Sequence, residues 1–245
     1  MATRNRLPAA PRRMLGDVLD ALLPARCPGC GAPGALVCAR CEATLEAPRF
    51  APPPPPLDWW ASCFVYRGVA REMVARSKYR GERRFLPAVA ERVAALVAGA
   101  PAPVDLVTWV PASAARMRSQ GVDHGELLAR CVARDIRVPA AARLSRALGR
   151  AQTGLAASAR RTGPDLRPIG RNDGATILVV DDVATTGGTL GSAARALRSS
   201  GAARVFAVTI ARTPRPGTVS PERAYTPVTP IAPSDLRKPN SLGSR

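Results

Sequence analysis

Two adjacent carboxylates that end an apolar run are the residues in this chain best placed to do chemistry. The run "ILVV" (177–180) is followed by Asp181 and Asp182, and then by the stretch "VATTGGT". Gly187 and Gly188 tolerate unusual backbone angles, so the N–H groups after the acidic pair can point inward, and the next helix adds the positive end of its dipole. The pattern predicts a cradle for one phosphate beside two acceptors for vicinal sugar hydroxyls. Together these indicate a ribose 5-phosphate ligand.

A simpler alternative treats this stretch as a plain junction between a strand and a helix. In that interpretation Asp182 and Thr189 cap the helix and bind nothing. However, the apolar run, the acidic pair, the Thr-Thr-Gly-Gly loop and the helix start occur in one order. Thr185 and Thr186 also add hydroxyl donors to the backbone donors of the loop. The combination favours the ligand site.

Four of the six cysteines form a second group with chemical potential. They occur as "CPGC" and "CARC", with two residues inside each pair and seven between the pairs, at Cys27, Cys30, Cys38 and Cys41. Two such knuckles can place four thiolates around a tetrahedral Zn²⁺ with no open position, which predicts a structural zinc ribbon. Disulfides are the alternative, and a reducing cytosol disfavours them. The other two, Cys63 and Cys131, fall in apolar patterns and are expected to pack in the core.

The elements that must position these groups alternate between strands and helices. Continuous apolar strands separated by helices predict an α/β fold with a parallel sheet covered on both faces. The expected strands are 61–68, 105–110, 141–148, 175–182 and 203–212, and the expected helices lie within 69–99 (two, joined by a basic turn), at 123–136 and at 188–201. A polar, arginine-rich loop is expected over about 149–174.

Changes in composition along the sequence predict four regions. Residues 1–47 would hold a short amphipathic helix and the zinc ribbon, and 48–57 a polyproline II linker. Residues 58–212 would form the main domain. From 213 to 245 proline, serine and threonine dominate, which predicts a disordered tail.

The amino-acid composition indicates which kinds of partner the protein can bind. The formal charge is +18 in 245 residues, carried almost wholly by arginine, so the surface attracts anions such as nucleic acid, acidic lipid or a polyphosphate metabolite. A bias in genomic base composition is the alternative source of this charge. No apolar stretch is long enough for a membrane-spanning helix, and Asp17 and Asp20 interrupt any export signal, which predicts a cytoplasmic protein.

The stretch after the acidic pair closely resembles the 5-phosphoribosyl-1-pyrophosphate (PRPP) signature of type I phosphoribosyltransferases. The resemblance implies that Asp181 and Asp182 hold the ribose hydroxyls. It assigns the 5-phosphate to Ala184, Thr185, Thr186, Gly187, Gly188 and Thr189. With the cysteine pairs ahead of it, the chain resembles the competence-associated ComF family over about residues 14–212, including "KYRGER", "VTWVPASAARMRSQGVDH" and "AQTGLAASAR".

The ComF resemblance also implies a pyrophosphate site. The turn Pro111, Ala112 and Ser113 would face the pyrophosphate, with positive charge from Arg116, Lys78 and Arg80. Cations and Mg²⁺ there would stabilise the departing group. A solvated helix face is the alternative for Arg116. A mobile loop containing Gln152, Gly154 and Arg160 would close over the reaction, whereas His124, the only histidine, is expected to be structural.

Two functional hypotheses follow. In the first, the chain binds PRPP with Mg²⁺ and transfers the phosphoribosyl group to a nitrogenous acceptor, with no covalent nucleophile. In the second, it is a non-enzymatic accessory in DNA uptake that binds single-stranded DNA or competence proteins. Trp59, Trp60 and Tyr66 would then offer stacking surfaces, although packing of the ribbon onto the main domain explains that cluster better.

Overall fold

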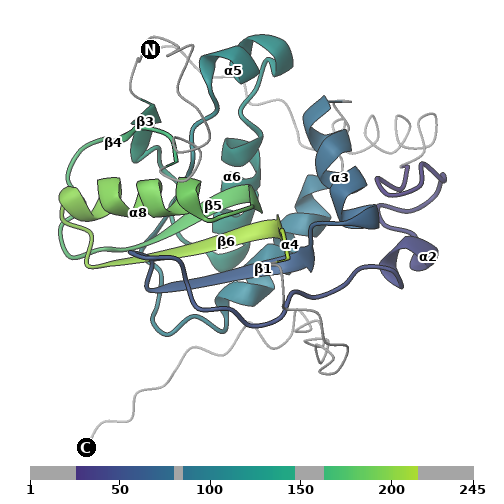
Figure 1. The fold of residues 1–245 in the computed structure, drawn as a ribbon, viewed down its shortest axis with the longest axis horizontal. Coiled ribbons are helices and arrows are strands. Elements are labelled where there is room, and N and C mark those ends of the chain that lie inside the picture. The colour runs from purple at the N-terminus through teal and green to yellow at the C-terminus, as the bar shows by residue number, and fades with distance from the viewer. Residues whose placement is uncertain (1–25, 80–84, 147–162, 215–245) are drawn as a thin grey trace, which may run out of the picture.

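A single parallel sheet forms the centre of the molecule. The computed structural model describes residues 26–79, 85–146 and 163–214. Within them, four parallel strands are arranged in the order β1-β6-β5-β2 (Figure 1). They are β1 (Trp59–Val65), β2 (Leu106–Trp109), β5 (Thr176–Ala184) and β6 (Arg204–Arg212).

Helices and one small hairpin surround this sheet. The described helices are α2 (Ala39–Glu42), α3 (Gly68–Tyr79), α4 (Leu86–Val97), α5 (Ala114–Gln120), α6 (His124–Ile136) and α8 (Gly188–Ser199). The hairpin pairs β3 (Leu144–Arg146) with β4 (Leu166–Pro168) in antiparallel register. None of the helices among the described residues has the length and hydrophobicity needed to cross a bilayer.

The two faces of the sheet carry separate hydrophobic cores. Buried residues of α3, α4 and α6 pack with Leu178 and Val180 on one face. Buried residues of α8 pack with Ile177 and Val179 on the other, together with Leu144 of the hairpin. The four residues of the apolar run, 177–180, are fully buried. Successive side chains of a strand point to opposite faces, and both faces of this sheet are covered. The predicted fold class is confirmed.

Most predicted elements are present, with shifted ends. The exceptions are short elements. The helix at 114–120 and the strand at 166–168 were not predicted. The strand predicted over 141–148 is only three residues long. Three-residue strands and a seven-residue helix give too few repeats for periodicity to register. The greater part of the predicted arginine-rich loop and of the tail lies outside the described residues, as does the predicted N-terminal helix.

The proline run is more than a spacer. Instead of a continuous polyproline II helix, the chain turns at Pro55 and Pro56, and Leu57 is buried in the core shared with α8. Asp58 then accepts hydrogen bonds from Arg198 Nη2 at 2.6 Å and from the Val205 N–H at 2.7 Å. These contacts attach the end of the run to the main domain.

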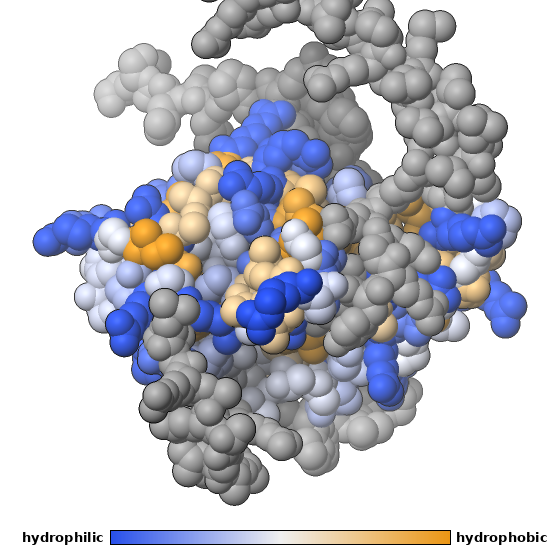
Figure 2. Space-filling model, turned by 90° about the horizontal axis from the view of Figure 1, so that it is seen from above, coloured by the Kyte–Doolittle hydropathy of each residue, from blue (hydrophilic) through white to orange (hydrophobic). Residues whose placement is uncertain are grey.

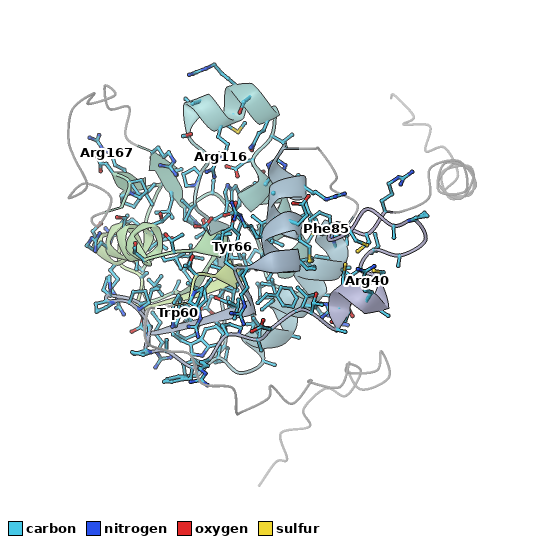
Figure 3. All side chains as sticks on the ribbon, turned by 45° about the vertical axis from the view of Figure 1, so that its right-hand side comes forward. Arg40, Trp60, Tyr66, Phe85, Arg116 and Arg167 are labelled. Carbon is cyan, nitrogen blue, oxygen red and sulfur yellow. The ribbon has the colours of Figure 1, made fainter. Side chains whose placement is uncertain are left out.

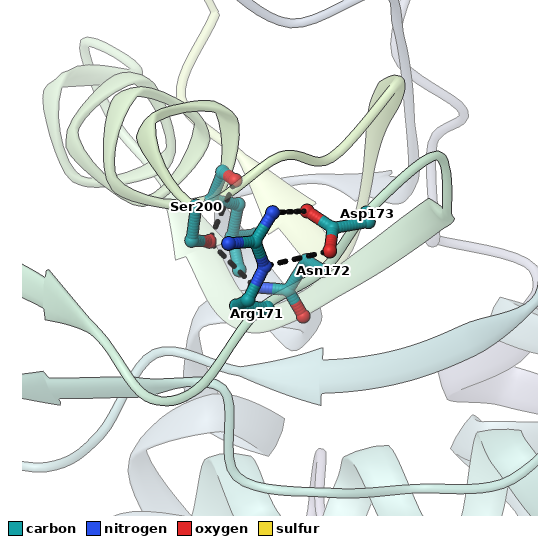
Figure 4. A network of polar contacts seen from close by, with 5 residues as sticks. Arg171, Asn172, Asp173 and Ser200 are labelled. Carbon is teal, nitrogen blue, oxygen red and sulfur yellow. Dashed lines mark hydrogen bonds and ion pairs between the residues drawn. The ribbon is translucent and has the colours of Figure 1, made fainter.

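A polar network ties the C-terminal end of α8 to the turn before β5 (Figure 4). Buried Asn172 donates from Nδ2 to Ser200 Oγ at 2.6 Å, and its N–H donates to the Ser200 carbonyl at 2.8 Å. The neighbouring pair of Arg171 and Asp173 is exposed at the surface. The network fixes the end of α8 that lies opposite the acidic pair.

Replacing Asn172 with alanine is expected to lower the free energy of unfolding by about 1–3 kcal/mol, because the buried side chain and its hydrogen bond to the half-buried Ser200 hydroxyl are lost. Arg171→Ala is the matched control: its side chain is 85% exposed, so the expected loss is within about 0.5 kcal/mol. Denaturant unfolding of both variants measures the difference. Equal losses would contradict the structural role of Asn172.

Candidate functional site

The acidic pair lies near the carboxyl end of β5, which continues to Ala184, two residues beyond the predicted end. Open parallel sheets bind ligands at this end of their strands. Both carboxylates are partly exposed, and Asp181 is in register with Thr209 of β6. The Asp182 N–H donates to Asp181 Oδ1 at 2.9 Å. The backbone therefore orients the first carboxylate.

The predicted phosphate loop connects β5 to α8. Ala184 is buried and ends β5, Thr185 and Thr186 are exposed, and α8 begins at Gly188. The Gly188 N–H donates to Thr186 Oγ1 at 3.3 Å. The N-cap residue of α8 is Gly187, which has no side chain, so neither Asp182 nor Thr189 occupies the N-cap position.

Two close approaches require glycine around this loop. Gly187 has φ +81°, and a Cβ added there would lie 2.7 Å from Pro54 Cγ. Gly163, also at positive φ, lies so close to α8 that an added Cβ would overlap the Gly188 backbone. The proline run and the segment that returns at residue 163 therefore both pack against the start of α8. Sequence reasoning missed both contacts.

The predicted pyrophosphate turn is held in place from α6. Asp123 accepts hydrogen bonds from the Ala112 N–H at 2.8 Å through Oδ2 and from the Gly125 N–H at 2.9 Å through Oδ1. Its side chain thus caps α6 and fixes the turn after β2 with the same carboxylate. The turn continues through Ser113, whose side chain caps α5.

Arg116 projects from α5, which has no buried residues and stands at the top of the molecule in Figures 1 and 3. Seen from above, this face shows hydrophilic side chains beside small apolar patches (Figure 2). Arg116 is exposed, as its solvated-face alternative requires. It also lies near enough to Arg146 for the two charges to interact.

Arg146 is a site residue that sequence reasoning missed. It ends β3, is partly buried, and donates from Nε to the Pro111 carbonyl at 2.6 Å. Burial lowers the pKa of Arg146, and the charge of Arg116 lowers it further, while Asp181 and Asp123 act in the opposite direction. The guanidinium therefore contacts the predicted pyrophosphate turn, and Asp181 is near enough for the two charges to interact. The only signal for it in the sequence was an arginine near the end of a predicted strand.

For several other predicted site residues, the structure gives only the element or no position. Lys78 belongs to the last turn of α3, and Arg80 lies outside the described residues, as do Gln152, Gly154 and Arg160. Gln152, Gly154 and Arg160 belong to the range 147–162. The two described residues that flank this range, Arg146 and Gly163, both lie at the site. His124 is buried as the first residue of α6, in agreement with its structural interpretation.

The four N-terminal cysteines converge as predicted. Their Sγ atoms all lie within 4.8 Å of one another, and none of the six cysteines in the chain forms a disulfide. Cys30 Sγ and Cys38 Sγ are 3.7 Å apart, close to the roughly 3.8 Å expected for two thiolates on a tetrahedral Zn²⁺. The donor set and its spacing fit the metal.

The thiol environments differ across this cluster. Burial disfavours the Cys27 thiolate, but backbone N–H groups, the first from Cys38, outweigh burial and lower the pKa of Cys27 to about 6. Burial and the neighbouring sulfurs raise the pKa of Cys41 to about 12. Cys63 and Cys131 pack against the hydrophobic core, as predicted.

Two aromatic residues after the proline run, Trp59 and Trp60, line a separate cavity. Trp60 donates from Nε1 to the Ala51 carbonyl at 2.8 Å, and the Arg212 guanidinium lies 4.9 Å from its ring centroid. Trp59 packs edge-on against Phe206. A cavity of about 800 Å³ lies between β1, α4 and the segment 42–51. Figure 3 shows Trp60 far from Arg116, so this cavity is distinct from the site at β5.

Comparison with known proteins gives one family match. Residues 124–231 match the family described as the phosphoribosyl transferase domain. No match was found among curated proteins.

Solved structures give more distant resemblances. The glutamine PRPP amidotransferase of B. subtilis is 22% identical over 51% of this chain and 26% of its own, with a TM-score of 0.36. This chain thus spans about a quarter of that enzyme. A hypothetical protein from Neisseria gonorrhoeae with bound ppGpp is 13% identical over 58% of this chain and 76% of its own, with a TM-score of 0.38. Adenine phosphoribosyltransferase of Leishmania donovani is 18% identical over 56% of each chain, with a TM-score of 0.36.

The family match covers α6, β5, the loop after the acidic pair, α8 and β6. The matched residues therefore resemble a phosphoribosyl transferase domain, and the chain has a parallel-sheet α/β fold of the type I phosphoribosyltransferase kind.

Proposed function

We propose that the chain binds PRPP with Mg²⁺ at the carboxyl end of β5 and transfers its phosphoribosyl group to a nitrogenous acceptor. The observation that carries this proposal is the junction itself. Asp181 and Asp182 lie in the last part of β5, which ends at Ala184, and a turn through Gly187 leads into the N-terminus of α8. The phosphoribosyl transferase match spans this junction.

The loop and the acids would hold the two ends of the ribose. Backbone N–H groups and hydroxyls from Ala184 to Thr189 would bind the 5-phosphate, and the dipole of α8 would favour its negative charge. Asp181 and Asp182 would accept hydrogen bonds from the ribose hydroxyls. As the bond to pyrophosphate breaks, C1 gains positive charge, which the nearby carboxylates would partly balance.

The turn after β2 would face the pyrophosphate, with Pro111, Ala112 and Ser113 held by Asp123 from α6. Arg116 would add positive charge from α5. Mg²⁺ prefers carboxylate and phosphate oxygens, so Asp181 and Asp182 suit a cation that arrives with PRPP. When bound, it would neutralise part of the charge of the leaving group.

Calorimetric titration with PRPP and Mg²⁺, followed by a pyrophosphate-release assay across candidate nitrogenous bases, tests the proposal. Saturable binding at one site and base-dependent release are expected. Binding without release for any base would reduce the function to PRPP binding. Absence of binding would overturn the proposal.

We also propose that Cys27, Cys30, Cys38 and Cys41 hold a structural Zn²⁺. The proposal is supported by their sulfur spacing and by the backbone N–H groups that favour the Cys27 thiolate. Such a site closes all four positions of the metal, so it would stabilise the ribbon and take no part in the reaction.

One zinc ion per chain is expected by elemental analysis, and Cys41→Ser is expected to lose it. Because Cys41 is buried beside Gly29, its loss should also expose residues 26–46 to proteolysis while the main domain stays folded. Cys131→Ser is the control and should keep the full metal content. Metal-free protein with an intact ribbon would contradict the zinc site.

A ComF-type accessory role in DNA uptake, with single-stranded DNA as ligand, is the second candidate. The cavity beside Trp59 and Trp60 favours it, because Arg49, Arg92 and Arg212 also line this cavity and base stacking with cations is the usual mode of single-strand binding. Against it, Arg212 already covers the Trp60 ring. Salt-dependent binding of an oligonucleotide that survives Asp181→Asn and is lost in Trp60→Ala would favour this role.

A further inference from the structure

We propose that Pro54 is a positioning residue of the PRPP site, because it holds the loop at Gly187 in the shape that binds the 5-phosphate. This inference rests on the proposed function and adds to the site a part of the chain that lies before β1. It follows from the contacts between the proline run and α8, from what else holds the loop, and from the stiffness of the run.

The first argument is that the proline run lies against the start of α8. A Cβ added at Gly187 would be 2.7 Å from Pro54 Cγ, and one added at Gly191 would be 3.2 Å from the Pro55 carbonyl oxygen. These two glycines are four residues apart and therefore lie on the same face of the helix. The absence of side chains on this face lets the run approach the backbone of α8 closely.

The chain just after Pro54 is anchored to the main domain. The Leu57 N–H donates to the Pro54 carbonyl at 3.0 Å, and the Leu57 side chain is buried in the core shared with α8. Asp58 then accepts hydrogen bonds from Arg198 Nη2 at 2.6 Å and from the Val205 N–H at 2.7 Å. These contacts give the Pro54 ring a fixed place beside the loop.

The second argument concerns the loop itself. Hydrogen bonds fix its two ends, since the Thr213 N–H donates to the Ala184 carbonyl at 2.9 Å and the Gly187 carbonyl accepts the first bond of α8 at 2.8 Å. Residues 185–186, between these ends, are exposed. The three atoms nearest to a Cβ added at Gly187 all belong to the Pro54 ring. Because glycine is free to adopt many backbone angles, this ring is what restricts Gly187 to its position.

The third argument is the stiffness of the proline run. Residues 52–56 are five consecutive prolines. Each ring fixes its own φ, and each proline restricts the residue before it. Such a segment loses little conformational entropy when it packs, so it can order the loop before a ligand arrives. A loop that is ordered in advance binds its ligand more tightly, because binding no longer has to order it.

Pro54 would touch neither the substrate nor the reacting atoms. Its effect would reach the ligand through the N–H groups between Ala184 and Thr189, which are proposed to bind the 5-phosphate. The pyrophosphate is proposed to lie at the turn after β2, which Asp123 holds from α6. Loss of the Pro54 ring should therefore weaken one half of the site and leave the other half unchanged.

Calorimetry with three ligands tests this expectation. The ligands are ribose 5-phosphate, PRPP with Mg²⁺, and pyrophosphate with Mg²⁺. For Pro54→Ala, we expect ribose 5-phosphate and PRPP to bind about 5- to 30-fold more weakly, which is the effect of ordering one more backbone residue on binding. Pyrophosphate should bind within about twofold of the wild type.

Two control variants separate positioning from other effects. Pro52→Ala makes the same replacement in the same run at an exposed residue, and it should leave all three affinities unchanged. Asn172→Ala loosens the opposite end of α8, so it controls for a general loss of stability and should also leave the affinities unchanged.

Hydrogen exchange provides a readout that needs no ligand. In Pro54→Ala, the amides of residues 187–189 should exchange about 5- to 30-fold faster than in the wild type, whereas those of α6 should keep their rates. Pro54→Val restores carbon atoms beside Gly187 without the ring, so intermediate changes are expected in both measurements. If Pro54→Ala does not fold, the valine variant carries the test by itself.

The outcomes separate this inference from the function on which it rests. Unchanged binding of ribose 5-phosphate in Pro54→Ala overturns the inference and leaves the proposed function standing. Equal losses for all three ligands, or the same losses in Asn172→Ala, would mean that Pro54 only stabilises the fold, which also overturns it. A wild-type chain that binds none of the three ligands overturns the proposed function, and the inference with it.

Discussion

Asp182→Asn is expected to weaken PRPP binding by about 10- to 100-fold, since hydrogen bonds to charged groups contribute about 1.5–3 kcal/mol each. The variant keeps the shape of the side chain but replaces one acceptor oxygen with a donor and removes the charge. A ribose hydroxyl would then face an amide, and the carboxylate that balances positive charge at C1 would be missing. Calorimetry with PRPP and Mg²⁺ measures the change.

Asp173→Asn is the control for this experiment. Asp173 is also an acid near β5, but it lies before the strand, pairs with Arg171 and is exposed. Its replacement should leave PRPP affinity unchanged. If Asp182→Asn binds PRPP as tightly as the wild type, the ribose is not held by this carboxylate and the assignment of the site is wrong.

Gly187→Ala is expected to have the largest effect on the fold near the site. At φ +81°, an alanine costs about 1 kcal/mol or more, and its Cβ would lie 2.7 Å from Pro54 Cγ. Pro54 is a rigid ring, so the loop itself would have to shift. We expect a loss of about 2–4 kcal/mol in the free energy of unfolding, together with weaker binding of ribose 5-phosphate.

Two further variants separate backbone strain from the contact. Gly174 also has positive φ, at +70°, but nothing lies within 4 Å of a Cβ added there, so Gly174→Ala should cost only about 1 kcal/mol. Adding Pro54→Ala to Gly187→Ala should restore part of the stability, because the two residues are in contact and their effects should couple. If Gly187→Ala unfolds no more easily than Gly174→Ala, the proline run does not pack on the loop as described.

The sequence predicts well those features that are local in the chain. The apolar run 177–180, the acidic pair and the glycine loop occur within 13 residues, and the structure keeps them as one strand, one turn and one helix start. The cysteine pairs behave similarly, because two residues inside each pair and a short spacer leave few ways to arrange four sulfurs. The alternation of apolar strands with helices was enough to predict a sheet covered on both faces.

The features that the sequence does not predict join distant segments. Arg146 reaches Pro111 across 35 residues of sequence, and Pro54, which precedes β1, packs on Gly187 at the start of α8. Each depends on where two elements dock, which periodicity does not encode. Only one of the two roles of Asp123 can be predicted from the sequence. Its position before α6 predicts the helix cap, whereas nothing local predicts its hydrogen bond with the Ala112 N–H.

A crystal structure of the chain with PRPP and Mg²⁺ tests the central claim most directly. The account predicts the 5-phosphate within hydrogen-bonding distance of the N–H groups between Ala184 and Thr189, and the ribose hydroxyls on Asp181 and Asp182. PRPP bound elsewhere, for example in the cavity beside Trp60, with the loop at Gly187 empty, would contradict it.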